Sequence, residues 1–172
     1  MKIYAISMDR NLVAIGFRRI VSAAKKSGFN VKSIFFLDSV WSASFAGSWW
    51  KQKMGEGFSV NYIENEEAIS RFSQMISDAD VIAFSLMSVQ RNIALKICDK
   101  VKKINPEVKI ILGGYHPTLF PDDAVAFSDV ICLGEGEHVF VEFLKRVKNK
   151  ENFDGLANTW NKSNGEIIKN PR

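Results

Sequence analysis

The chain has 172 residues, a length typical of a single domain, and its 47% hydrophobic and 24% charged residues exclude a fibrous or intrinsically disordered protein. Its net charge is +4, but 23 basic residues are interspersed with 19 acidic ones. The densest basic cluster, residues 145–150, lies at the end of a predicted helix, where cations favour the helix dipole. A solvated helix end is therefore favoured over a nucleic-acid site.

The cysteines and the N-terminus bear on the compartment. Cys98 lies on the apolar stripe of a predicted helix and Cys132 inside a predicted strand, so core packing is favoured over disulfide or metal chemistry. Met1 leads straight into the first predicted strand, with no signal peptide and no apolar run of about 18 residues. We expect a cytoplasmic protein in a reducing compartment, with no membrane partner.

The first elements form a βαβ unit. Residues 2–7 predict a strand, residues 12–26 carry a helical apolar stripe, and Gly28 suits the C′ position after that helix. Residues 30–37 predict the second strand. The loop at residues 8–11 is therefore expected at the carboxyl edge of the sheet.

Residues 38–57 are the least regular stretch and contain Trp41, Trp49 and Trp50. Two interpretations are equally favoured. One is a functional or interface loop, and the other is a short helix that packs its tryptophans on the sheet edge.

The rest of the chain continues the alternation of strands and helices. The expected elements are an extended segment at 58–63, a helix at 66–77, a strand at 81–84, a helix at 89–104, strands at 108–112 and 129–133, and a helix at 138–148. Ser88 is a candidate N-cap for the helix that follows it, and Asp122-Asp123 a candidate start of a short helix. Residues 156–160 and 166–169 predict a hairpin.

This order of elements predicts a doubly wound α/β domain over residues 1–150, flavodoxin- or Rossmann-like. The expected sheet has five mostly parallel strands, with 2-1-3-4-5 as the favoured order. Residues 151–172 then form a C-terminal hairpin extension, interpreted as a linker toward a further domain.

Two of the predicted strands stop at glycine loops, Gly113-Gly114 and Gly134-Glu135-Gly136-Glu137. Both loops are expected side by side at the carboxyl edge of the sheet, which is where open α/β sheets bind ligands. A tight turn remains an alternative for Gly113-Gly114, and a first-turn helix residue for Glu137. Ser85, at the end of the neighbouring strand, adds a hydroxyl to the same edge.

Several chemistries lack support. The phosphate-binding patterns GxxxxGK-S/T and GxGxxG are absent, and His116 and His138 are the only histidines, so no His-rich metal site can form. A Ser85, His116 and Asp9 nucleophile system is conceivable, but no GxSxG elbow accompanies it. Asp122 and Asp123 are adjacent, so their side chains diverge and a paired acid and base is disfavoured.

The block ILGGYHPTLFPDDAVAFSDVICLGEGE, which ends at Glu137, resembles a strand, a GG-x-H-P/A-T loop, an acidic segment, a strand and a GEGE loop of a known family. DVIAFSLM, residues 80–87, resembles that family's preceding strand and SxL-type turn. The family is the cobalamin-binding N-terminal domain of radical S-adenosylmethionine enzymes. The resemblance covers about residues 1–150, and residues 155–172 resemble its linker to the radical domain.

The resemblance implies a corrinoid ligand. It places Ser85, Met87 and the glycine loop at 113–114 near the dimethylbenzimidazole tail, and residues 134–137 near the cofactor or its nucleotide loop. The cofactor-binding candidates are Asp9, Arg10, Asn11, Ser85, Met87, Gly113, Gly114, Tyr115, His116, Gly134, Glu135, Gly136 and Glu137.

The wider superfamily has D-x-H-x-x-G after its first strand, with the histidine as lower cobalt ligand. Here the stretch begins Asp9-Arg10-Asn11, so asparagine replaces the histidine, and the glycine is displaced to Gly16. The resemblance then implies either cobalamin without a histidine ligand, which is easier to reduce to the nucleophilic Co(I) state that suits methyl transfer, or a domain that has lost cobalamin. Whether another group such as Arg10 takes the histidine's place stays open.

The cluster motif Cys-x3-Cys-x2-Cys is absent, so this chain alone is not expected to catalyse radical chemistry. By resemblance, the parent enzyme would be a radical methyltransferase or cyclase. Its radical domain would hold a 4Fe-4S cluster and S-adenosylmethionine, and would be the partner of this module. The alternatives are a degenerate scaffold that docks a partner through its tryptophans and, least favoured, a small hydrolase.

Overall fold

The computed structural model describes residues 1–8, 14–36 and 65–171. The predictions for Asp9, Arg10 and Asn11, for the aromatic stretch 38–57 and for the extended segment 58–63 lie outside these residues.

The described residues form a seven-stranded sheet in the order β2-β1-β3-β4-β5-β6-β7. Its strands are β1 (Ile3–Ser7), β2 (Val31–Phe35), β3 (Val81–Ser85), β4 (Lys109–Gly113), β5 (Val130–Cys132), β6 (Thr159–Ser163) and β7 (Glu166–Lys169). The first five strands are parallel, which confirms the order 2-1-3-4-5. β6 and β7 form the predicted hairpin, and β6 pairs antiparallel with β5, so the hairpin continues the same sheet.

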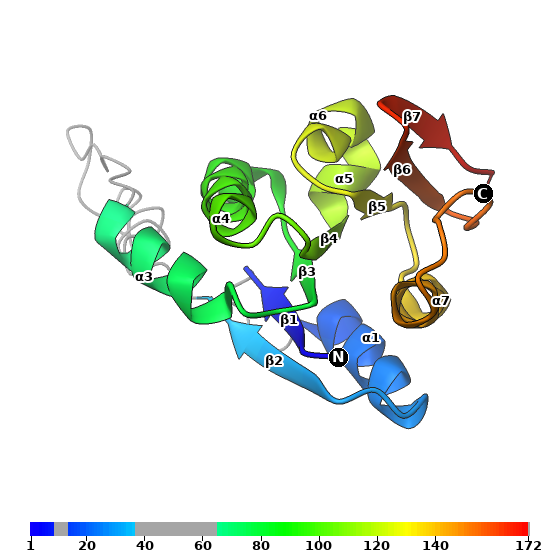
Figure 1. Ribbon diagram of the computed structural model, residues 1–172, viewed down its shortest axis with the longest axis horizontal. Coiled ribbons are helices and arrows are strands. Elements are labelled where there is room, and N and C mark those ends of the chain that lie inside the picture. The colour runs from blue at the N-terminus through cyan, green and yellow to red at the C-terminus, as the bar shows by residue number, and fades with distance from the viewer. Residues whose placement is uncertain (9–13, 37–64, 172) are drawn as a thin grey trace, which may run out of the picture.

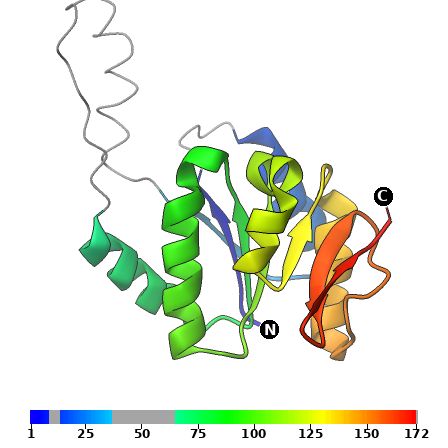
Figure 2. The same cartoon turned by 90° about the horizontal axis from the view of Figure 1, so that it is seen from above.

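Helices cover both faces of this sheet, as the two views show (Figure 1, Figure 2). They are α1 (Ile15–Lys26), α3 (Glu66–Ile76), α4 (Arg91–Ile104), α5 (Tyr115–Leu119), α6 (Pro121–Ala126) and α7 (Glu137–Asn149). Side chains of α3, α4 and α6 pack with one face of the sheet into one hydrophobic cluster. Side chains of α1 and α7 pack with the other face into a second cluster. The doubly wound prediction is confirmed.

Alternation along the strands explains the two clusters. In β3, Ile82 and Phe84 belong to the α3/α4/α6 side, whereas Val81 and Ala83 belong to the α1/α7 side. Both sets are almost fully buried, so the strand reads in the sequence as a continuous apolar run.

Two predictions concern residues at helix ends; the one for Gly28 is confirmed and the one for Ser88 is wrong. Gly28 follows the end of α1 with a φ of +85°, as expected for a glycine at C′. Ser88 is not the N-cap of α4, because the backbone first forms a 3-10 turn, η1 (Ser88–Gln90), and Gln90 takes the capping position. The Ser88 hydroxyl instead lies 3.2 Å from the Nδ1 atom of His116.

The first strand of the hairpin, Thr159–Ser163, lies three residues later in the sequence than the predicted strand at 156–160. Asn164 and Gly165 both have positive φ, at 51° and 84°, and form a two-residue turn that leaves Ser163 paired with Glu166. The first strand therefore continues up to the turn and starts at Thr159.

Among the described residues, no helix is long and apolar enough to cross a membrane. Cys98 and Cys132 are both free and buried, which confirms their prediction as core residues.

Candidate functional site at the carboxyl edge of the sheet

Three neighbouring strands end in small residues at the same level. The register pairs Ser7 of β1 with Ser85 of β3, and Ser85 with Gly113 of β4. The predicted meeting of the β3 and β4 loops at this edge is confirmed.

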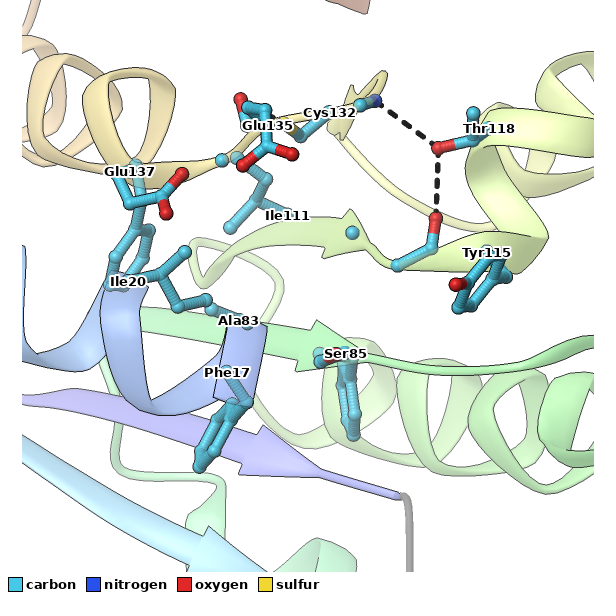
Figure 3. A pocket seen from close by; sticks show the side chains of 17 residues that line it. Phe17, Ile20, Ala83, Ser85, Ile111, Tyr115, Thr118, Cys132, Glu135 and Glu137 are labelled. Carbon is cyan, nitrogen blue, oxygen red and sulfur yellow. Dashed lines mark hydrogen bonds between the residues drawn. The ribbon is translucent and has the colours of Figure 1, made fainter. Parts of the chain in front are cut away.

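A cavity of about 350 Å³ opens at this edge, between the sheet and helices α1 and α7. Phe17 and Ile20 of α1 and Ala83 and Ile111 of the sheet are among the residues that line it (Figure 3). Gly113 and Gly114 also line it, together with the loop at residues 134–137. Both glycine loops of the sequence motif thus border one cavity.

Small residues create this space. Ala83, Ser85 and Gly113 follow the alternation that points side chains toward α1 and α7, whereas Phe84 and Leu112 point to the opposite face. The core on the α1/α7 side therefore lacks side-chain volume where β3 and β4 end.

Gly114 holds the β4 loop against the β3 loop. Its φ is +98°, and a Cβ there would lie 2.7 Å from the carbonyl oxygen of Leu86. The backbones are joined where they touch, because the amide of Leu86 donates to the Gly113 carbonyl and that of His116 to the Leu86 carbonyl. Only glycine fits this position, so the second glycine of the pair has a structural explanation.

Thr118 joins the two glycine loops to each other. Its hydroxyl donates to the Gly114 carbonyl at 2.9 Å and accepts from the Gly134 amide at 3.2 Å (Figure 3). This threonine lies within the sequence motif but was not among the predicted site residues. One side chain thus fixes both sides of the cavity mouth.

The rim of the cavity carries paired charges. Arg19 of α1 lies 2.6 Å from Glu137, measured between Nε and Oε1, and 3.8 Å from Glu135. The Glu135 side chain is 86% exposed, whereas that of Glu137 is 19% exposed. Because two carboxylates share one guanidinium, this part of the rim is acidic.

Cys132 lies in the cavity wall. Burial raises the pKa of its thiol to about 12, and the nearby carboxylates of Glu137 and Glu135 contribute to this rise. The thiol stays protonated near neutral pH and acts as a small, weakly polar wall group.

His116 faces away from the cavity. It is 4% exposed, and its Nε2 atom lies 2.9 Å from Asp123 Oδ2. Asp123 also accepts two hydrogen bonds from the Arg91 guanidinium, at 2.8 and 2.6 Å, and this interaction lowers the pKa of the carboxyl below its ordinary value. With Ser88 on its other ring nitrogen, His116 does not pair with Ser85 as the hydrolase alternative requires.

The candidate site residues fall into three groups. Those that line the cavity are Ser85, Gly113, Gly114, Tyr115, Gly134, Glu135, Gly136 and Glu137. Met87 and His116 do not line it, and Asp9, Arg10 and Asn11 lie outside the described residues. The lining residues contributed by α1 were not predicted, because its apolar stripe gave no sign that Phe17 and Ile20 face a cavity rather than closed core.

A sequence profile described as the B12 binding domain matches residues 51–144, which is more than half of the chain. The chain belongs to the B12-binding domain family. Within that match lie both glycine loops that border the cavity.

The similarity of this B12-binding domain to characterised proteins extends to larger enzymes. It is 30% identical over 80 residues to the bacteriochlorophyllide d C-8(2)-methyltransferase of Chlorobaculum tepidum, a match that covers 45% of this chain and 17% of that protein. The chain thus spans about a sixth of the length of that relative.

Solved structures share the fold. The radical S-adenosylmethionine methyltransferase TsrM from Kitasatospora setae, solved with cobalamin and a 4Fe-4S cluster, matches 98% of this chain with a TM-score of 0.67 at 11% identity. The cobalamin-dependent S-adenosylmethionine radical enzyme OxsB matches 98% with a TM-score of 0.65 at 17% identity. The B12-binding domain corresponds to 28% and 22% of those two chains.

Proposed function

We propose that this domain binds a corrinoid, with the nucleotide base of the cofactor in the cavity and the corrin ring over the carboxyl edge of the sheet. In this proposal it presents the corrinoid to the catalytic domain of a larger radical S-adenosylmethionine enzyme, of methyltransferase or cyclase type. The observation that carries the proposal is the cavity bordered by both glycine loops of the B12-binding family.

The size and shape of the cavity fit part of such a cofactor. Its volume of about 350 Å³ lies at the low end for small-molecule sites, which span roughly 300–1,000 Å³. A space of this size can enclose a planar base but not a whole corrinoid. The missing side chain of Gly113 leaves the mouth open beside Ser85, so the rest of the cofactor can lie across the strand ends.

Neither histidine of the chain lines the cavity. His116 is buried among Ser88 and Asp123, and His138 is an exposed residue of α7. The engagement of His116 by Ser88 and Asp123, together with the asparagine at motif position 11, supports binding of the corrinoid without a histidine ligand to its cobalt. A bound corrinoid would supply cobalt chemistry such as methyl transfer.

The chain's own residues would bind and orient the cofactor. The Ser85 hydroxyl at the mouth is placed to hydrogen-bond a polar atom of the base or its ribose, and Glu135 is placed to accept from donor groups above it. Thr118 and Gly114 would hold the loops in position before the ligand arrives.

Titration with hydroxocobalamin and methylcobalamin tests this proposal through the visible spectrum. We expect saturable binding and a base-off spectrum, because a base held in the cavity cannot coordinate cobalt. Ser85→Ala should weaken binding about 2- to 10-fold, the effect of one lost hydrogen bond.

Ser73→Ala is the matched control, since Ser73 is buried on the other face of the sheet, where its hydroxyl donates to the Ile69 carbonyl. No spectral change at high micromolar cobalamin would reject the proposal in favour of a scaffold without cofactor.

A further inference from the structure

We propose that the cavity selects corrinoids by their lower base, preferring an apolar benzimidazole to a purine. This inference rests on the proposed function, because it concerns which corrinoid the same cavity takes.

The side chains that enclose the inner part of the cavity are apolar or nearly so. They come from both helices of the α1/α7 side and from three adjacent strands, and all belong to or pack against one hydrophobic cluster. They are Phe17, Ile20, Ala83, Ile111, Cys132 and Phe140. All except Ile20 are at most 5% exposed, so the inner wall is part of the core.

The polar side chains of the cavity, which include that of Tyr115, lie at its more exposed mouth. The Thr118 hydroxyl is both donor and acceptor to the two glycine loops, and Glu137 is paired with Arg19. Ser85 stands at the end of its strand, and Glu135 projects into solvent. Among the described residues that line the cavity, the Cys132 thiol is the only polar side-chain group that is buried.

The two kinds of base differ at the edge that enters first. Each base is attached to ribose through one ring nitrogen, so the opposite edge reaches deepest into the cavity. In dimethylbenzimidazole that edge carries two methyl groups, whereas in adenine it carries ring nitrogens and an amino group. Polar atoms enclosed by an apolar wall lose their hydrogen bonds to water without replacement, which opposes binding.

The preference can be measured with three corrinoids on the whole chain. The probes are cobalamin, its adenine-base analogue and cobinamide, which has no lower base. We expect the adenine analogue to bind about 10- to 100-fold more weakly than cobalamin, the discrimination typical when one or two polar groups are buried unpaired. Cobinamide should also bind more weakly than cobalamin, because it leaves the cavity unfilled.

A pair of cysteine variants localises the preference. Cys132→Ser places a hydroxyl in the inner wall and should reduce the preference for cobalamin over the adenine analogue by about 3-fold or more, since the hydroxyl offers a hydrogen bond to the purine edge. Cys98→Ser makes the same change at a buried residue of α4 in the other cluster, and should leave the preference unchanged.

The outcomes separate this inference from the proposed function. Equal affinities for cobalamin and its adenine analogue would overturn the inference and leave corrinoid binding standing, and so would equal affinities for cobalamin and cobinamide. Failure of all three corrinoids to bind would overturn the proposed function and the inference with it. The affinities of the wild-type chain for the three corrinoids test the inference even if a serine variant does not fold.

Discussion

The two faces of the sheet are made from the same strands but end differently at the carboxyl edge. Toward α3, α4 and α6, the strands finish in large side chains such as Phe84 and Leu112, and the core is closed. Toward α1 and α7, Ala83 and Gly113 leave a cavity. Alternation along a strand lets one face hold the fold together while the other keeps space for a ligand.

The titratable groups near the motif also differ between the closed face and the open face of the sheet. On the closed side, Asp123 binds both His116 and Arg91, so the histidine of the motif stabilises the loop that contains it. On the open side, Glu135 and Glu137 stand at the rim with one arginine between them. The motif thus combines loop support on one face with polar groups that face the cavity mouth on the other.

Gly114→Ala should have the largest effect on stability, because it disrupts the contact between the β3 and β4 loops that both faces share. We expect the free energy of unfolding to fall by about 3 kcal/mol or more, from a strained φ and a clash with the Leu86 carbonyl. Urea denaturation measures this loss.

Gly165→Ala is the control for backbone strain alone. Gly165 has a φ of +84° in the hairpin turn, and a methyl group added there would have open space around it. This variant should therefore lose only about 1 kcal/mol. Equal losses in the two variants would show that the approach of Gly114 to Leu86 is not a tight one.

Asp123→Asn tests the closed face through its pH dependence. The interaction with Arg91 lowers the folded-state pKa of Asp123, so its contribution to stability is present above the unfolded value of about 4 and is lost as the pH falls through the lower folded value. The variant should lose about 1 kcal/mol at pH 7, since partial exposure screens the pair, and the difference from wild type should shrink below about pH 4.

Asp122→Asn is the matched control, because the neighbouring side chain is 78% exposed and lies 3.5 Å from Lys169. It should change stability little at any pH. A difference between Asp123→Asn and wild type that stays constant down to about pH 2 would contradict the ion-pair explanation.

Thr118→Val should have a modest effect, because the Gly134 amide is exposed and water can replace the lost hydroxyl. We expect a loss of about 1 kcal/mol in stability and a few-fold weaker binding of cobalamin. Thr118→Ser keeps the hydroxyl and should restore most of both quantities. Identical behaviour of the two variants would mean that the hydroxyl does not couple the loops.

The order of the strands could be predicted because strands and helices alternate with clear boundaries, and parallel strands place their following loops at one edge. This reasoning brought Ser85, Gly113 and Gly134 together correctly. The short helix α5 was not predicted, since Pro117 suggests a loop, although proline is tolerated in a first helical turn.

The cavity itself could not be predicted from the sequence. It depends on how closely α1 and α7 approach the sheet, which the apolar stripe of each helix does not specify. His116 also pointed the wrong way for the nucleophile alternative, because its orientation is set by Asp123 and Arg91. These two partners come from helices α6 and α4, so the orientation of His116 depends on contacts between separate elements.

The most direct test of the central claim compares cobalamin binding after the same substitution on each face. Ala83→Val adds volume inside the cavity, and Ala94→Val adds it to the closed core of α4. We expect Ala83→Val to weaken hydroxocobalamin binding about 10-fold or more in a spectral titration, and Ala94→Val to lower stability while leaving affinity unchanged. Unchanged affinity in Ala83→Val, with the protein folded, would contradict a corrinoid site on the α1/α7 side of the sheet.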